Sequence, residues 1–170
     1  MILRWIGAIC IVIGSGFIGL AHTYHHKKTV NLLKQVISAV DYMERELKYR
    51  HPPVPELFSS AAEHISGTIG ELLKHVAIET ELRFHQDVRT CFDIVMEKSF
   101  HLPDIIVCAC QLIGSAIGEF DISGQIENLN NVHSECLTMQ DKLTEEQDIR
   151  MRSFQTLALC CGAAVAILLI

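Results

Sequence analysis

The fold is decided by residues 122–170, ISGQIENLNNVHSECLTMQDKLTEEQDIRMRSFQTLALCCGAAVAILLI, which contain no proline and join a polar helical pattern to an apolar end. The apolar residues of the polar part recur every three or four positions, as on one face of a helix: Ile126, Leu129, Val132, Cys136, Met139 and Leu143. Asp121 or Ser123 can cap its start. We predict one helix from about residue 122 to 170, roughly 70 Å long. The alternative is a bundle helix with a flexible joint at residues 145–150.

The apolar end of that stretch has a counterpart at the start of the chain. Residues 5–21, WIGAICIVIGSGFIGLA, and residues 154–170 are each 17 uncharged residues, and all 20 acidic residues lie between them. A helix of this length reaches about 25 Å, near the lower limit for crossing a hydrocarbon core of about 30 Å. We therefore predict transmembrane helices at 5–21 and 154–170, on either side of one domain at 22–153.

Basic residues flank both apolar segments on the side of the central domain. They are Lys27, Lys28, Arg150 and Arg152. Because basic flanks stay in the cytoplasm, we expect the central domain to be cytoplasmic and both termini to lie on the other side of the membrane. An alternative for the first segment is a signal peptide cleaved after Ala21, since the residues before it, Gly19 and Leu20, complete a small-x-small pattern.

Helix breakers within residues 22–153 occur in only two places. The prolines are Pro52, Pro53, Pro55 and Pro103. Pro55 and Pro103 each precede an acidic residue, an order that favours a helix start. The first apolar pattern of the domain has helical spacing: Val30, Leu33, Ile37, Val40, Met43 and Leu47. No segment alternates as a strand would, so we predict an all-α fold: a single helical bundle between two spans, with a long final helix running into the second.

Composition and motifs argue against several classes of protein. A formal charge of −6 and a pI near 5.8 make nucleic acid an improbable partner. Cys108 and Cys110 are two apart on a predicted helix and point in different directions, and no HExxH pattern supplies metal ligands. No nucleophile elbow and no Walker-type phosphate loop is present. We expect no enzyme activity, no metal and no cofactor.

One motif within the first apolar segment matches the sequence pattern of a cofactor-binding site. Residues 14–19, GSGFIG, match the dinucleotide fingerprint GxGxxG. That fingerprint needs a strand before it and an acidic residue on a second strand about twenty residues later. The next acidic residue, Asp41, falls instead within a helical pattern. We interpret these small residues as a packing surface between transmembrane helices.

Two stretches, ISGTIGEL at residues 65–72 and LIGSAIGEFDISGQI at residues 112–126, resemble the stage III sporulation protein AB family. The resemblance extends over the whole chain, because the length, both apolar ends, the proline-rich break at residues 51–55 and the long final helix also match. The family is similar in turn to a helical domain of the platform proteins of type II secretion and type IV pilus machines. In that domain a turn of small residues followed by a polar cap joins two helices, which Gly114, Gly118, Asp121 and Gln125 match here.

The resemblance implies a membrane platform in the sporulation channel between mother cell and forespore. The domain would face the mother-cell cytoplasm from the outer forespore membrane and dock a secretion-type ATPase, the sporulation protein AA. Its remaining partners would be other stage III channel subunits and the lipid bilayer. Assembly with further copies of the same chain is also compatible with this role. The candidate residues for partner binding or for bundle turns are Gly70, Glu71, Gly114, Gly118, Asp121 and Gln125; we favour a structural role for the glycines. A membrane-tethered helical signalling adaptor is the alternative function.

Overall fold

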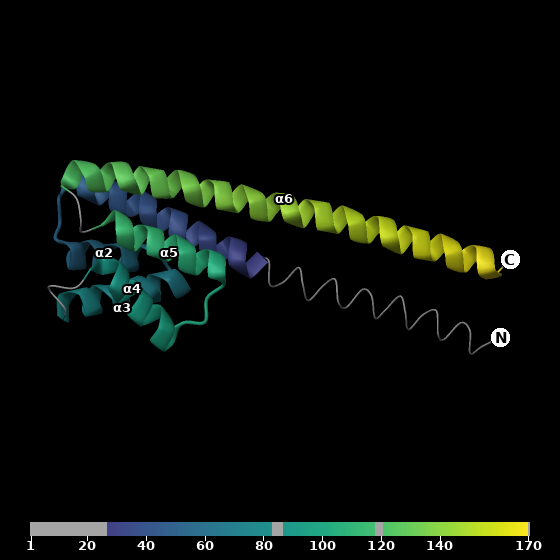
Figure 1. The fold of residues 1–170 in the computed structure, drawn as a ribbon, viewed down its shortest axis with the longest axis horizontal. Helices are drawn as coiled ribbons and strands as arrows, with labels where there is room; N and C mark the ends of the chain where they lie inside the picture. Colours follow the sequence, from purple (N-terminus) through teal and green to yellow (C-terminus); the bar gives the residue numbers. More distant parts are fainter. Residues whose placement is uncertain (1–26, 83–86, 118–120, 170) are drawn as a thin grey trace. The chain divides into compact units, whose positions relative to one another are not determined.

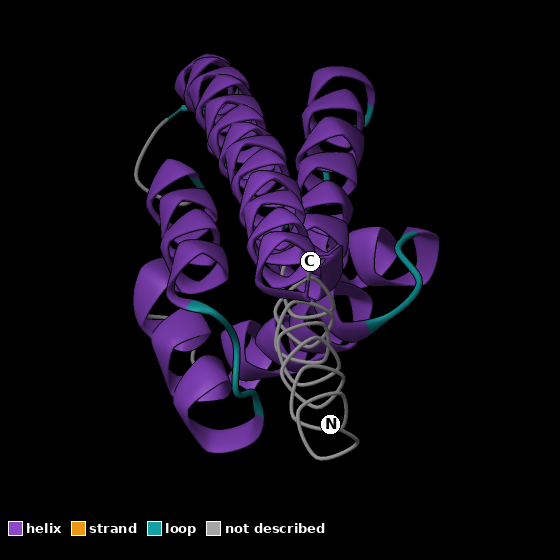
Figure 2. Cartoon of the chain, turned by 90° about the vertical axis from the view of Figure 1, so that its right-hand side faces the viewer, coloured by secondary structure: helices purple, strands orange, loops and turns teal. Residues whose placement is uncertain are grey.

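The computed structural model describes residues 27–82, 87–117 and 121–169, and within α6 it describes side chains only up to residue 145. In these ranges the chain is entirely helical between its turns (Figures 1 and 2). A helix over residues 27–49 is followed by α2 (Val54–His64), α3 (Thr68–Leu82), α4 (Val88–Ser99), α5 (Asp104–Ala116) and α6 (Ile122–Leu169). The prediction of an all-α bundle is confirmed. The chain divides into two units, residues 29–140 and residues 1–28 with 141–170.

The proline-rich break lies where the sequence indicates. The 27–49 helix ends in a turn in which the carbonyl oxygen of Glu46 accepts hydrogen bonds from the N–H groups of Arg50, at 2.8 Å, and His51, at 3.2 Å. His51 has a φ of 50°, a conformation that turns the chain sharply. Because Pro52 and Pro53 have no N–H to donate, the first helix cannot continue through them, and α2 starts directly afterwards.

The core draws on every helix of the 29–140 unit. On the 27–49 helix its fully buried members are Leu33, Val36, Ala39, Val40 and Met43. The predicted face shares Leu33, Val40 and Met43 with this set. Predicted Val30 and Ile37 are only half-buried, whereas Val36 and Ala39, which the pattern did not include, are completely buried. The buried face of this helix is wider than the single row of apolar residues that the sequence predicts. Ile37 lies at the edge of that face and is therefore only partly covered.

Aromatic and aliphatic contacts hold the short helices together. Helix α2 packs against α3, α3 against α4, and α4 against α5. The rings of Phe58 and Phe92 meet edge to face with centroids 5.5 Å apart, in the arrangement that aromatic pairs prefer. Both rings are completely buried. This pair therefore joins α2 and α4 at the centre of the core.

Helix α6 closes the bundle over residues 122–140. It buries Leu129, Val132 and Cys136, and His133 Nε2 lies 3.1 Å from Asp41 Oδ1 on the 27–49 helix. The two helices lie side by side in Figure 1. These buried positions are the centre of the face that the sequence predicts for this helix, whereas Ile126, Met139 and Leu143 are half-buried.

Helix α6 is continuous. It runs for 48 residues, so it has no break at residues 145–150, where the alternative interpretation places a flexible joint. Among the described residues, no helix is both long enough and apolar enough to cross a membrane. The first apolar segment, residues 5–21, lies outside the described ranges, as do the side chains of residues 154–170. The two spans thus stay predictions.

Candidate functional site

The first candidate pair, Gly70 and Glu71, lies at the start of α3. Gly70 is buried, and a Cβ atom at this position would overlap the carbonyl oxygen of Ile65 at the end of α2. Gly67, in the turn between the two helices, has a φ of 106°, which favours glycine. Glu71 is exposed, and its N–H donates to the carbonyl oxygen of Gly67 at 3.1 Å. Glycine here allows α3 to begin against the end of α2, and the carboxylate beside it faces solvent.

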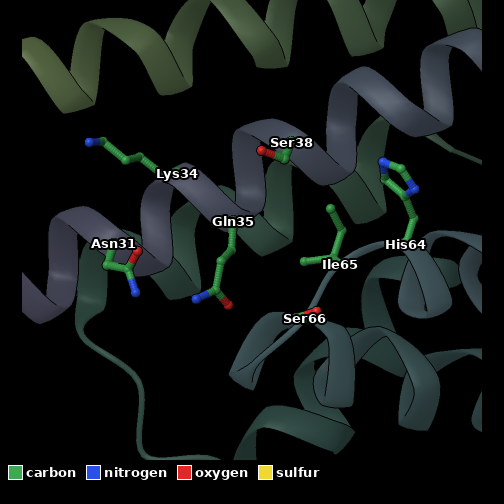
Figure 3. A pocket seen from close by; sticks show the side chains of 7 residues that line it. All are labelled: Asn31, Lys34, Gln35, Ser38, His64, Ile65 and Ser66. Atoms are coloured by element: carbon green, nitrogen blue, oxygen red, sulfur yellow. The ribbon is translucent and has the colours of Figure 1, made fainter.

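Gln35 supports this turn from the 27–49 helix. Its side-chain oxygen accepts a hydrogen bond of 3.3 Å from the N–H of Ile69, and its amide lies against Gly67. A shallow depression of about 360 Å³ opens beside it, as Figure 3 shows. The depression is lined by Asn31, Lys34, Gln35, Ser38, His64, Ile65 and Ser66. The sequence gives no indication of this bond, since its partners are 34 residues apart.

Gly114 lies where α5 crosses α4. A Cβ atom here would come within 2.8 Å of the Arg89 Cα atom and 3.2 Å of the Phe92 ring. Because the Arg89 atom belongs to the backbone, the two helices would have to separate to admit even an alanine. One turn away, the amide of Gln111 donates to the Asp93 carboxylate at 2.8 Å. Gly114 is therefore a point of close contact between α4 and α5.

Asp121 caps the start of α6. Its carboxylate accepts a hydrogen bond of 3.1 Å from the N–H of Gly124, and its carbonyl oxygen accepts one of 2.9 Å from the N–H of Gln125. Of the two caps considered from sequence, Asp121 is thus the residue that binds the free N–H groups of the first turn. Gln125 is half-buried in that turn. Gly118 lies outside the described residues.

The remaining candidate residues mark helix ends. Pro55 is the second residue of α2, and Pro103 directly precedes α5, where its carbonyl oxygen accepts from the N–H groups of Ile106 and Val107. Lys27 and Lys28 are exposed at the start of the first described helix. Arg150 and Arg152 belong to the helical part of α6 whose side chains are not described.

The cysteines of the domain differ in exposure. Cys108 is exposed and Cys110 is buried, so these neighbours do point in different directions. Burial raises the pKa of the Cys110 thiol to about 12, with a smaller effect from Cys136. Burial likewise raises the pKa of Cys136 to about 11. Both thiols are protonated at neutral pH and poor nucleophiles. Within the described ranges, no group of three His, Cys, Asp or Glu side chains is placed to hold a metal ion.

Helix α3 has a solvent-facing surface that the sequence patterns did not single out. We define the α3 outer face as the six exposed residues Glu71, Lys74, His75, Ile78, Glu81 and Leu82. Ile78 is 48% exposed and Leu82 is 75% exposed, although both are large and apolar. The sequence does hold a signal for them, because they fall outside the buried face formed by Ile69, Leu72, Leu73 and Val76. Ile78 and Leu82 are four residues apart and so lie next to each other on α3, and neighbouring exposed apolar side chains are a feature of interaction sites.

Comparison with known proteins gives one consistent result. The family model described as stage III sporulation protein AB matches residues 4–170. A solved structure of stage III sporulation protein AB (SpoIIIAB) is similar, with a TM-score of 0.61 and 14% sequence identity. The match covers 72% of this chain and 98% of that chain. At this identity, the structural likeness concerns the fold alone. No curated protein matches the sequence significantly.

Proposed function

Because the chain belongs to the stage III sporulation protein AB family, we propose that it is a membrane platform component of the channel between mother cell and forespore. In that channel it docks a secretion-type ATPase, the sporulation protein AA, and assembles with other stage III subunits. The observation that carries the proposal is the extent of the family match, which takes in both apolar ends together with the helical domain. A helical domain between two membrane anchors is the layout that a platform requires.

The chemistry of the domain supports a binding role. Its buried thiols are held protonated, and its polar candidate residues cap helices or support turns. Protonated thiols are poor nucleophiles, and side chains that cap helices or support turns hold the backbone in place and do not act as general bases. We therefore propose that the protein is not an enzyme and that any energy its complex uses comes from nucleotide hydrolysis by the docked partner.

The membrane arrangement is part of the same proposal. Lys27 and Lys28 lie next to the first apolar segment, and α6 passes through Arg150 and Arg152 before residues 154–169. Basic residues at both junctions favour two spans in the outer forespore membrane with the domain in the mother-cell cytoplasm. Exposed Cys108 offers a direct test. A membrane-impermeant maleimide should label it only after permeabilisation, and a Cys108→Ser variant supplies the background; labelling of intact cells would contradict this orientation.

Recovery of the ATPase tests the docking role. Full-length chain carrying an affinity tag should co-purify with the ATPase from detergent-solubilised membranes of sporulating cells. A two-span membrane protein of similar abundance, tagged in the same way, serves as the control. Absence of the ATPase from the tagged sample, at a depth that detects other channel subunits, would contradict the proposal.

One observation favours a second candidate, a membrane-tethered signalling adaptor. Helix α6 is continuous from its cap at Asp121 to Leu169, and an unbroken helix can transmit a displacement along its axis. An adaptor would bind a signalling partner in place of an ATPase. Recovery of a kinase or receptor, without the ATPase, in the same purification would identify this function.

A further inference from the structure

We propose that the α3 outer face is a docking surface for a basic protein surface with an apolar centre. This inference rests on the proposed function, under which that surface belongs to the ATPase. It goes further by naming where on the domain the partner binds and what chemistry it presents. The steps below concern α3 and its neighbours within the 29–140 unit.

The apolar centre of this face is formed by Ile78 and Leu82. They are four residues apart, so they lie one above the other on the same side of α3. Their exposed fractions of 48% and 75% contrast with at most 1% for Leu72 and Leu73 on the opposite side of the helix. Figure 1 shows α3 on the far side of the bundle from α6. With these exposed fractions, both side chains are available to a partner.

Charged residues surround this centre. Glu71, Lys74 and Glu81 belong to the face itself, and the His75 ring lies against the edge of Phe100, with centroids 6.0 Å apart, at the end of α4. Over residues 54–99, the described residues carry eight acidic and three basic side chains, a net charge of −5 with histidine counted as neutral. All eleven are exposed except the half-buried Glu79. An apolar centre within a polar border is the usual plan of a protein interface.

The negative charge of the layer formed by α2, α3 and α4 favours one kind of binding partner over others. Residues 27–50, by contrast, carry six basic and three acidic side chains. A membrane surface rich in anionic lipid would repel the acidic layer. A second copy of this chain would also be repelled, because it would bring the same acidic layer to the contact. A partner whose surface is basic is attracted to it and gains in association rate as well as affinity.

A binding measurement on the full chain tests this assignment. The chain is reconstituted in nanodiscs of neutral lipid, and the dissociation constant of the purified ATPase is measured by interferometry. Replacing both apolar residues, Ile78→Ser with Leu82→Ser, should weaken binding at least about tenfold, because apolar anchors at the centre of an interface dominate its affinity. Leu137→Ser on α6 is the matched control, since Leu137 is 41% exposed, and it should leave binding unchanged.

A second pair of variants tests the charge. Glu71→Gln with Glu81→Gln should weaken binding by about threefold to tenfold and reduce its dependence on salt. The same change at two exposed acidic residues of α6, Glu127→Gln with Glu135→Gln, should have little effect. Circular dichroism should show the same melting temperature for all four variants, because the side chains are exposed.

The outcomes separate this inference from the function on which it rests. If the ATPase binds the wild-type chain and the Ile78/Leu82 variant equally well, the inference is overturned and the docking role stands. If the ATPase does not bind the wild-type chain at all, the docking role fails and the inference fails with it. Loss of self-association in the Ile78/Leu82 variant, with ATPase binding intact, would assign the face to a second copy and overturn the inference.

Discussion

The two long helices and the three short helices α2–α4 bury similar side chains but present different surfaces. The 27–49 helix is basic and begins beside the first apolar segment, and α6 continues into the last residues of the chain. The α2–α4 layer is acidic, and its outer side carries exposed Ile78 and Leu82. Under the function that we propose, the two regions have separate tasks: the long helices connect the domain to the apolar ends, and the short helices offer a surface to the ATPase.

The short helices and α5 pack closely, with backbone contacts at two glycines. Gly70 and Gly114 allow backbone contacts between α2 and α3 and between α4 and α5. The long helices instead meet through side chains, including the pair of His133 and Asp41. Changes to the short helices should therefore cost more stability than changes at the same depth in the long ones.

The largest expected effect comes from removing an aromatic ring between the short helices. Phe92→Ala deletes a completely buried ring that contacts Phe58, and we expect it to lower the free energy of unfolding by about 3–5 kcal/mol. Urea unfolding of the detergent-solubilised chain, followed by circular dichroism, measures this loss. Tyr49→Ala, at a residue that is 77% exposed, should change stability by less than about 0.5 kcal/mol. Equal losses from the two variants would contradict the burial of the Phe92 ring between α2 and α4.

A smaller loss is expected where α5 crosses α4. Gly114→Ala places a methyl group against the backbone of Arg89 and should cost about 1–3 kcal/mol in the same urea experiment. Ser115→Ala, at the neighbouring half-buried residue, removes only a hydrogen bond to the Gln111 carbonyl within α5 and serves as control. A Gly114→Ala variant as stable as the wild type would show that α4 and α5 do not meet as closely as we describe.

Alkaline pH should destabilise the fold through the buried thiol of Cys110. Burial raises the pKa of Cys110 from 9.0 to about 12, so above pH 9 the unfolded chain loses this proton while the folded chain keeps it. Stability is therefore lost between pH 9 and 12, by about 1 kcal/mol from Cys110 at pH 10. Urea unfolding at pH 8 and 10 measures the loss. Cys110→Ala should reduce the difference between the two pH values, and Cys108→Ala should not; an unchanged difference in the Cys110 variant would contradict the raised pKa.

The cap of the long final helix should have the smallest of these effects. Asp121→Ala removes the acceptor for the Gly124 N–H and should cost about 1 kcal/mol of unfolding free energy. Ser123→Ala, the other residue that could have capped this helix, should cost little. The reverse order would show that the cap lies at Ser123.

Local patterns allowed much of the fold to be predicted. The spacing of three and four residues identified Leu129, Val132 and Cys136 as buried, and the absence of proline after Pro103 predicted the continuous α6. Contacts between residues far apart in the sequence could not be predicted from local patterns. Nothing near Gln35 in sequence indicates its bond to Ile69, and the contact of Gly114 with Arg89 depends on how α4 and α5 cross. The exposure of Ile78 and Leu82 could have been inferred, since both fall outside the periodic core face of α3.

The central claim is that the short helices bind the ATPase while the long helices do not. Hydrogen–deuterium exchange of the full chain in nanodiscs, with and without saturating ATPase, tests it most directly. We predict slower exchange in residues 71–82 when the ATPase is present, and unchanged exchange in residues 27–49 and 122–145. Protection confined to the long helices, with residues 71–82 unchanged, would contradict it.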